Sequence, residues 1–224
     1  DLHSTSRRQR QMCIRDRIGS TEHGHLKQVL DLFTQTAAEI CGGQQFDMEF
    51  ESRMDVSEEE YIEMIRLKTA VLLACALKTG ALLGGASQKD ADHLYAFGIN
   101  IGLAFQLQDD LLDVYGDTAT FGKNIGGDIL CNKKTFLLIN ALRLANKEQA
   151  EALRSWMDKK EFDPAQKIQA FTSIYNELQL KQLTENKIQA YYDASVENLN
   201  ALQVAPEKLT ILKEVCDHLM HRQS

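Results

Sequence analysis

Proline is almost absent from this chain, which leaves long uninterrupted stretches free to form helices. Only Pro164 and Pro206 occur among the 224 residues. Proline breaks a helix interior because it lacks an N–H donor and its ring clashes with the preceding turn. The proline-free stretches are rich in Leu, Ala, Lys, Glu and Gln, which are good helix formers. The sequence therefore predicts an all-α protein that buries one substantial core.

The charge and the apolar runs argue against several classes of protein. A formal net charge of −7 argues against nucleic acid as a main partner. The longest apolar run, residues 70–77, is far shorter than the ~20 residues that a transmembrane helix needs. The five cysteines form no CxxC pair, which favours a reduced, cytoplasmic setting.

Residues 1–17 differ in composition from the rest of the chain. They hold five of the ten arginines, no lysine and no helical pattern of apolar residues. A short transit peptide is one explanation, but the two aspartates in this segment weaken it. We expect a non-native segment here, with residues 18–224 forming the domain.

An aspartate-rich segment, FQLQDDLLDVYGD, spans Phe105–Asp117. On a helix, residues three and four apart share a face, so that Asp109, Asp110 and Asp113 would lie close together. Like charges at this spacing repel unless a cation lies among them, and Mg²⁺ prefers such oxygen ligands. A solvated acidic helix face is the alternative, and the segment by itself leaves both open.

A lysine lies on the apolar face of another expected helix. This helix should begin at the capping box of Ser57 and Glu60 and end near Gly80. One row on it, in steps of four and three, contains Tyr61, Ile65, Lys68, Leu72 and Cys75. Because lysine is rarely buried without a partner, Lys68 either reaches the surface or binds an anion.

Glycines mark two places where helices can approach each other closely. Gly42-Gly43 follows a helical stretch that starts at residue 24, and a glycine pair inside a helix costs ~2 kcal/mol relative to alanine, so we expect close packing or a kink there. Gly98 and Gly102 precede Gln106 and Asp110 at four-residue spacing on a helix expected over 92–115. The second row fits plain helix packing, or a cavity wall beside which a ligand lies. On the cavity hypothesis, Gly102→Leu would impair ligand binding more than folding.

A glycine-rich loop, residues 121–128, leads through Asn132-Lys133-Lys134-Thr135 into a helix expected over 136–145. Such a loop can bring backbone N–H groups close to an anion, although its spacing is not that of a Walker loop. The remainder, 147–224, predicts three or four amphipathic helices that act as a scaffold.

These segments, in this order, closely resemble the trans-isoprenyl diphosphate synthases. The resemblance covers essentially residue 24 to the C-terminus and implies an isoprenoid synthase-type helical bundle. Such enzymes condense isopentenyl diphosphate with an allylic diphosphate to give a longer linear trans-prenyl diphosphate. Their cofactor is Mg²⁺, and they are usually homodimers.

The resemblance implies a role for each acidic match. Asp109, Asp110 and Asp113 match the second aspartate-rich motif of the family, which binds the Mg²⁺ that holds the allylic diphosphate. Gln44 and Asp47 match a GQxxD element, with Asp47 in the metal and water network and Gln44 on the substrate side. Asp117 and Asp128 match further acidic positions, which have a supporting role in this family.

The basic and polar matches concern the substrates. The lysines that bind diphosphate in this family match Lys68, Lys123 and Lys133. Thr69 and Gln106 match positions whose oxygen dipoles face the developing allylic cation. Phe105 matches a position near isopentenyl diphosphate. The residues expected to act in catalysis are Lys68, Thr69, Gln106 and Asp109.

The chemistry of prenyl transfer agrees with these residue types. A carbon–oxygen bond ionises, so that diphosphate leaves while an allylic cation forms. Lysines and Mg²⁺ stabilise the departing negative charge, and apolar walls keep water from the cation. No histidine or cysteine nucleophile is required.

The chain departs from the family in one respect. Such synthases carry a first DDxxD-type motif that faces the second, whereas Asp109-Asp110 is the sole Asp-Asp pair here. We expect the chain to be an N-terminally truncated part of a synthase that contains half of the metal site. Whether the chain alone is active, and which product length its parent makes, stays open.

Two other functions stay open as well. A class I terpene cyclase shares an aspartate-rich metal site, but the lysines favour a synthase; cyclic hydrocarbon products would identify a cyclase. A non-catalytic partner subunit of a prenyl synthase is the other alternative. Assays of the chain alone and with a catalytic subunit would separate these functions.

Asp109→Ala tests the metal role of the aspartate-rich segment. We expect prenyl transfer to fall by orders of magnitude while the helix content stays intact, because a carboxylate that binds Mg²⁺ is removed. Turnover is measured from prenyl diphosphate products and helix content by circular dichroism. A rate near that of the wild type would rule out the metal role.

Overall fold

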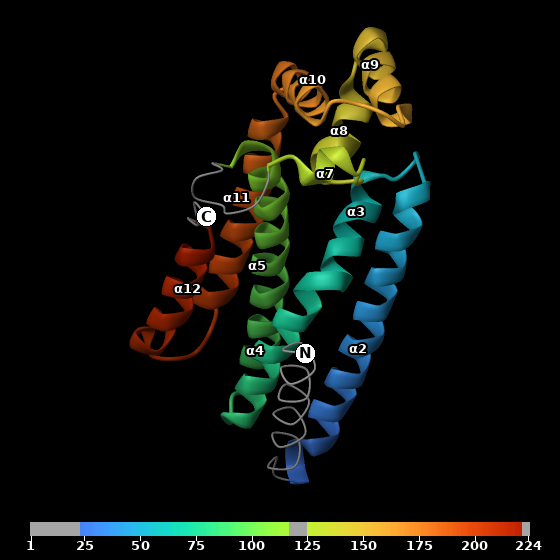
Figure 1. Cartoon of the computed structure of the whole chain (residues 1–224). Helices are drawn as coiled ribbons and strands as arrows, with labels where there is room; N and C mark the ends of the chain where they lie inside the picture. Colours follow the sequence, from blue (N-terminus) through green and yellow to red (C-terminus); the bar gives the residue numbers. More distant parts are fainter. Residues whose placement is uncertain (1–22, 117–124, 221–224) are drawn as a thin grey trace, which may run out of the picture.

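The computed structural model describes residues 23–116 and 125–220, and all regular structure in these ranges is helical. The all-α prediction is thereby confirmed for these ranges. Three long helices run along the molecule: α2 (His23–Ser52), α5 (Gln88–Tyr115) and α11 (Leu180–Asn200) (Figure 1). The segment 1–17, which we expected to be non-native, lies outside the described residues.

A π-helix interrupts the rod that precedes α5. This rod consists of α3 (Glu58–Ile65), η1 (Arg66–Ala70) and α4 (Val71–Leu83). It starts at the predicted capping box, in which Ser57 Oγ accepts from the Glu60 N–H at 3.2 Å and Glu60 Oε2 accepts from the Ser57 N–H at 2.9 Å. The rod continues past the expected stop at Gly80.

The π-turn changes which residues face the core. The predicted row is wrong at Leu72, which is 55% exposed, whereas Tyr61, Ile65 and Cys75 are buried. A π-turn takes more residues than an α-turn, so the helix after it is rotated relative to a row counted at α-helical spacing. Short π-segments inside α-helices often occur at functional sites, and this one contains Lys68.

Helix α5 is the centre of the bundle, because α4 and α11 both pack against it. A Cβ atom at Gly98 would lie 2.5 Å from Ala74 Cα, and one at Gly102 would lie 2.7 Å from Ala70 Cα. The cavity hypothesis for this glycine edge is therefore wrong. The backbone of the neighbouring helix fills the space, so that plain packing explains both glycines.

Helix α2 runs through the glycine pair without ending. A Cβ atom at Gly43 would lie 2.4 Å from Lys68 N and 2.8 Å from Leu67 Cβ, whereas one at Gly42 would meet nothing within 4 Å. The close packing expected at the pair is thus confirmed at Gly43. It places α2 directly against η1.

The shorter helices gather at one end of the bundle, where α2 and α5 end and α3 begins (Figure 1). They are α7 (Gly127–Leu130), α8 (Phe136–Leu144), α9 (Lys147–Asp158) and α10 (Pro164–Glu177). After α11, η2 (Pro206–Leu209) leads into α12 (Thr210–Met220). Among the described residues, four α-helices from Lys147 onward agree with the three or four helices predicted for this part of the chain. Among the described residues, none of the helices meets the length and hydropathy that crossing a membrane requires.

A pair of neighbouring substitutions tests the contact of α2 with η1. Gly43→Ala should lower the free energy of unfolding by about 1–3 kcal/mol, because its methyl group would overlap backbone atoms. Gly42→Ala should raise it by up to ~1 kcal/mol, since alanine is the better helix former in open space. Urea denaturation followed by circular dichroism measures both. Equal stabilities for the two variants would contradict the close approach.

Candidate active site

A cavity of about 510 Å³ lies between the end of α2 and the turn that joins α7 to α8. Two residues predicted for the site from distant parts of the sequence, Asp47 and Lys133, both line it. The complete lining is Asp47, Phe50, Glu51, Asp128, Cys131, Asn132, Lys133 and Lys134. The fold thus brings acidic and basic side chains to one hollow.

The turn after α5 connects the aspartate-rich segment to this cavity. The Asp128 N–H donates to Asp113 Oδ2 at 3.0 Å, and the Gly126 N–H donates to the Asp113 carbonyl at 2.6 Å. Lys133 Nζ donates to both Asp128 carboxylate oxygens, at 3.1 and 3.2 Å. Burial opposes the charge on Lys133, but the nearby Asp128 and Asp110 carboxylates raise its pKa. The Lys133 ammonium therefore stays charged.

Lys68 has a carboxylate partner within the chain. Its Nζ lies 2.5 Å from Asp47 Oδ2, and the side chains are 35% and 23% exposed. The lysine is therefore half-buried and paired, rather than buried without a partner. Its placement does not by itself require a bound anion, but the ammonium is accessible to one.

A line of hydrogen bonds crosses from η1 to α5 and on to α3. Thr69 Oγ1 donates to Gln106 Oε1 at 3.2 Å, and Gln106 Nε2 donates to Asp110 Oδ1 at 3.4 Å. The Tyr61 hydroxyl donates to Asp110 Oδ2, and both of these side chains are buried. Burial raises the pKa of Asp110 to about 7, although the Tyr61 hydroxyl favours the charged form. The structure thus brings together the predicted residues Thr69, Gln106 and Asp110.

The three aspartates of the segment have different environments. Asp110 faces inward and accepts protein hydrogen bonds on both carboxylate oxygens. Asp113 is half-buried, and burial followed by the Asp128 charge raises its pKa. Asp109 is half-buried on α5. In residues 23–116 and 125–220, no three His, Cys, Asp or Glu side chains come close enough to share one ion.

The carboxylates of Asp109 and Asp113 nevertheless offer the kind of oxygen ligand that Mg²⁺ prefers. Magnesium in phosphate-transfer sites is commonly held by one or two carboxylates, with waters and phosphate oxygens as the remaining ligands. Asp109 and Asp113 are four residues apart on α5, and burial already raises the pKa of Asp113. A cation would favour the charged form of Asp113.

Gln44 and Phe105, also predicted for the site, are not among the residues that line the cavity. Gln44 is exposed on α2, one turn before Asp47, and Phe105 is half-buried on α5 beside Gln106. Lys123 and Asp117 lie outside the described residues.

Sequence reasoning missed Tyr61 and Lys134 as parts of the site. Tyr61 belonged to the same predicted row as Lys68, but no local pattern relates it to Asp110 on another helix. Lys134 is 8% exposed, and its Nζ donates to the Glu51 carbonyl at 3.3 Å near the end of α2. The double lysine was visible in the sequence, yet only the fold shows that its second member is buried.

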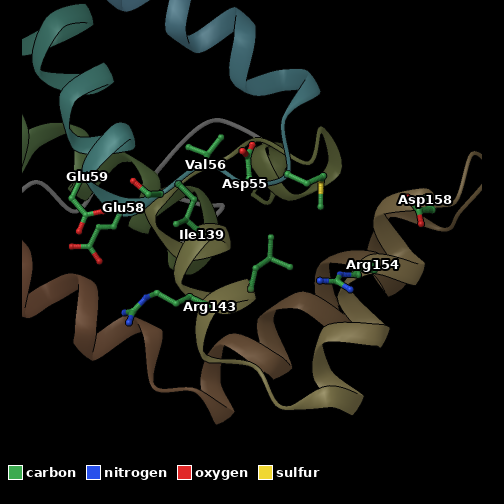
Figure 2. Close-up of a pocket in the computed structure, with 11 residues that line it drawn as sticks. Asp55, Val56, Glu58, Glu59, Ile139, Arg143, Arg154 and Asp158 are labelled. Carbon is green, nitrogen blue, oxygen red and sulfur yellow. The ribbon is translucent and has the colours of Figure 1, made fainter.

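A larger cavity of about 700 Å³ contains none of the predicted residues. It lies between the start of α3 and helices α8 and α9 (Figure 2). Its charged lining mixes both signs, with Arg143 and Arg154 facing the same hollow as Glu58 and Glu59 (Figure 2). The smaller cavity is therefore the candidate active site.

Known proteins similar to this chain share its predicted chemistry. The sequence pattern of the family described as polyprenyl synthetase matches residues 12–175. A short chain isoprenyl diphosphate synthase of Methanothermobacter thermautotrophicus is 45% identical over 58% of this chain and 40% of its own length. A geranylgeranyl diphosphate synthase of Methanosarcina mazei is 35% identical over 87% of this chain and 57% of its own length.

A solved structure extends this likeness to the fold. It is a geranylgeranyl pyrophosphate synthase from Corynebacterium glutamicum, in complex with isoprenyl diphosphate and magnesium. Its TM-score with this chain is 0.81 at 31% identity, over 90% of this chain and 57% of that one. The chain therefore spans roughly half the length of these relatives, and the predicted isoprenoid synthase-type bundle is confirmed.

The buried Asp110 carboxyl predicts a pH-dependent stability. Its pKa rises from an ordinary 3.8 to about 7 on folding, so the folded chain binds more protons between these values. The Asp110 contribution to the free energy of unfolding should thus fall as pH rises through this interval, by at most about 4 kcal/mol. Urea denaturation of wild type and Asp110→Asn, with a chelator present, isolates this contribution.

Two further variants control that measurement. Tyr61→Phe removes a donor that favours the charged carboxylate and so raises the pKa of Asp110 in the folded chain; the fall should begin at the same pH and extend to higher pH. Asp158→Asn, at an exposed position on α9, makes the same change of side chain away from the candidate site and serves as the matched control. If wild type and Asp110→Asn differed by the same amount at every pH, Asp110 would not titrate in this way.

Proposed function

Because this chain belongs to the polyprenyl synthetase family, we propose that it is part of a trans-prenyltransferase of isoprenoid biosynthesis. The reaction joins isopentenyl diphosphate to an allylic prenyl diphosphate and gives a longer linear prenyl diphosphate with release of diphosphate. Within that enzyme, this chain supplies the surface that holds the allylic diphosphate. The similarity to named synthases over most of this chain supports the proposal.

One observation carries this proposal: the cavity at the end of α2 is lined by Lys133 and Lys134 together with Asp47 and Asp128. Charge-assisted hydrogen bonds from lysine are the strong contacts that phosphate oxygens accept. The acidic groups would repel a diphosphate by themselves, so a site with both signs of charge favours a diphosphate bound together with a cation. Lys133 extends into this cavity with its side chain 41% exposed.

We assign Mg²⁺ as the cation, with Asp109 and Asp113 as its protein ligands and Asp47 in its surroundings. When bound, Mg²⁺ supplies positive charge to the diphosphate oxygens as negative charge develops on them. The related synthase from Corynebacterium glutamicum is named as a complex with isoprenyl diphosphate and magnesium, which supports this assignment. Asp110 was also expected as a metal ligand, but both of its carboxylate oxygens accept protein hydrogen bonds, so we assign it as the inner carboxylate that orients Gln106.

The basic residues act on the leaving group. Lys133 and Lys68 donate hydrogen bonds to oxygens of the departing diphosphate, where negative charge develops. Lys133 forms an ion pair with Asp128, and Lys68 forms one with Asp47. The diphosphate oxygens compete with these carboxylates for the ammonium groups. The ammonium groups therefore need little reorganisation when the carbon–oxygen bond breaks. Lys123 completes the set of diphosphate-binding lysines in this proposal.

The polar pair between η1 and α5 acts on the cation. The Thr69 hydroxyl donates a hydrogen bond to Gln106 Oε1, so that the lone pairs of Thr69 Oγ1 stay available toward the allylic carbon. Hydrogen bonds to Asp110 and Thr69 fix Gln106 in turn. Phe105, one residue before Gln106, lies near isopentenyl diphosphate, and Gln44 contributes to substrate binding. The displaced diphosphate takes the proton that is lost after the new carbon–carbon bond forms.

A cytoplasmic location and assembly as a homodimer complete the proposal. Cys41, Cys75, Cys131 and Cys216 are free thiols in the structure, in keeping with a reduced setting.

Binding of magnesium pyrophosphate tests the proposal without requiring turnover. The complete chain should bind inorganic pyrophosphate in the presence of Mg²⁺, measured by isothermal titration calorimetry. Lys133→Met should raise the dissociation constant about 10- to 100-fold, because one charge-assisted hydrogen bond is lost. Lys147→Met, at an exposed position on α9, removes the same positive charge away from the cavity and serves as the control. Equal affinities for wild type and Lys133→Met would contradict the assigned role.

A further inference from the structure

The most deeply buried lysine among the described residues lies outside the cavity. Lys167 on α10 has 0% of its surface exposed, so it cannot itself touch a ligand. Its Nζ donates to Asn132 Oδ1 at 2.7 Å and to the Leu130 carbonyl at 3.2 Å. The ring of Phe162 lies 4.3 Å from the same nitrogen, which adds a cation–π contact. The buried charge is thus directed at one short stretch of chain.

That stretch is the turn between α7 and α8, which carries Lys133. Asn132 has a φ of 52°, a left-handed conformation that asparagine tolerates better than most residues. Its side chain is fixed at both ends, because Oδ1 accepts from Lys167 while Nδ2 donates to the Met157 carbonyl at 3.1 Å. Asn132 therefore sets the direction in which the backbone enters Lys133.

A neighbouring residue of α10 holds the other end of α7. A Cβ atom at Gly126 would lie 2.6 Å from Ile168 Cδ1, so that the loop before α7 lies directly on α10. Helices α7 and α10 are in contact at the end of the bundle where the candidate site lies (Figure 1). Consecutive residues of α10, Lys167 and Ile168, thus fix both ends of the segment that carries Asp128.

We propose that Lys167 is a positioning residue that holds Asn132 from behind the turn and so directs the Lys133 ammonium into the cavity. This rests on the proposed function, in which Lys133 binds the diphosphate. A lysine is costly to bury, and an apolar residue of similar length would fill the same space at less cost. The ammonium of Lys167 is nevertheless useful here, because the Leu130 carbonyl and Asn132 Oδ1 both accept hydrogen bonds from it. An apolar side chain could donate to neither oxygen.

Binding of magnesium pyrophosphate to the complete chain tests this role. Lys167→Met keeps the length of the side chain and removes its donors, so the dissociation constant should rise about tenfold. The measurement is made by calorimetry at a temperature at which circular dichroism shows every variant to be folded. Since Lys167 acts through Lys133, the double variant Lys133→Met/Lys167→Met should bind no more weakly than Lys133→Met alone.

A destabilising variant far from the turn separates positioning from general stability. Leu199→Ala opens a cavity in a group of buried apolar residues, where Leu199 on α11 packs with Phe97 and Ile101 on α5. It should lower the melting temperature and leave the dissociation constant unchanged. Asn132→Gly keeps the left-handed backbone but removes the amide that Lys167 holds, so it should weaken binding as well. This variant decides the matter if Lys167→Met does not fold.

The outcomes separate this inference from the function on which it rests. A wild-type chain that binds no magnesium pyrophosphate would overturn the proposed function and the role of Lys167 with it. Binding by the wild type with unchanged affinity in a folded Lys167→Met, or in Asn132→Gly where Lys167→Met is unfolded, would overturn the positioning role alone. An equal loss of affinity in Leu199→Ala would also overturn it, because loss of stability would then explain the effect.

Discussion

The close approach of three helix backbones is the constraint on which the site depends. Gly98 and Gly102 let α5 touch Ala74 and Ala70, and Gly43 lets α2 touch η1 at Lys68. Longer distances between the axes would separate groups that now form hydrogen bonds. Only at this spacing does a short side chain such as Thr69 reach Gln106 across the contact. The glycines therefore act on the chemistry indirectly, by removing side chains between backbones.

The polar groups in this region occupy two zones. Thr69, Gln106, Asp110 and Tyr61 form an inner line that is buried or half-buried and is satisfied by its own hydrogen bonds. Burial of a carboxylate costs free energy, and the raised pKa of Asp110 is the sign of that cost. The outer zone contains Asp128 and Lys133, whose charges are accessible from the cavity. Inner groups thus give orientation, and outer groups give contact with the diphosphate that we propose.

The short turn from α7 to α8 has few contacts of its own to define it. Asp113 on α5 accepts from the Asp128 N–H at the start of α7, Lys134 reaches from the turn to the end of α2, and Lys167 supports the turn from α10. Each of these contacts joins segments that are distant in sequence. The four-residue helix α7 and the turn after it are too short to be rigid by themselves. The surrounding helices therefore supply the rigidity that accurate placement of the charged groups requires.

The sequence by itself determined the helices and the types of residue at the site. Scarce proline, a capping box and apolar spacing predicted an all-α chain, and the order of the aspartate and lysine segments predicted diphosphate chemistry through their resemblance to the trans-isoprenyl diphosphate synthases. These features are local, or depend only on the order of short segments. The acidic stretch could be interpreted as a metal site or a solvated face, since repulsion among its carboxylates depends on burial that no local pattern fixes.

Tertiary structure decided which of those groups meet and what each environment does to them. The π-turn at Arg66–Ala70 rotated Leu72 outward, and packing filled the space beside Gly102, which decided between the two alternatives of plain packing and a ligand cavity. The contacts of Tyr61 with Asp110 and of Lys167 with Asn132 join different helices. Such contacts follow from how helices pack and how far each group is removed from water, and spacing along one chain segment carries neither quantity.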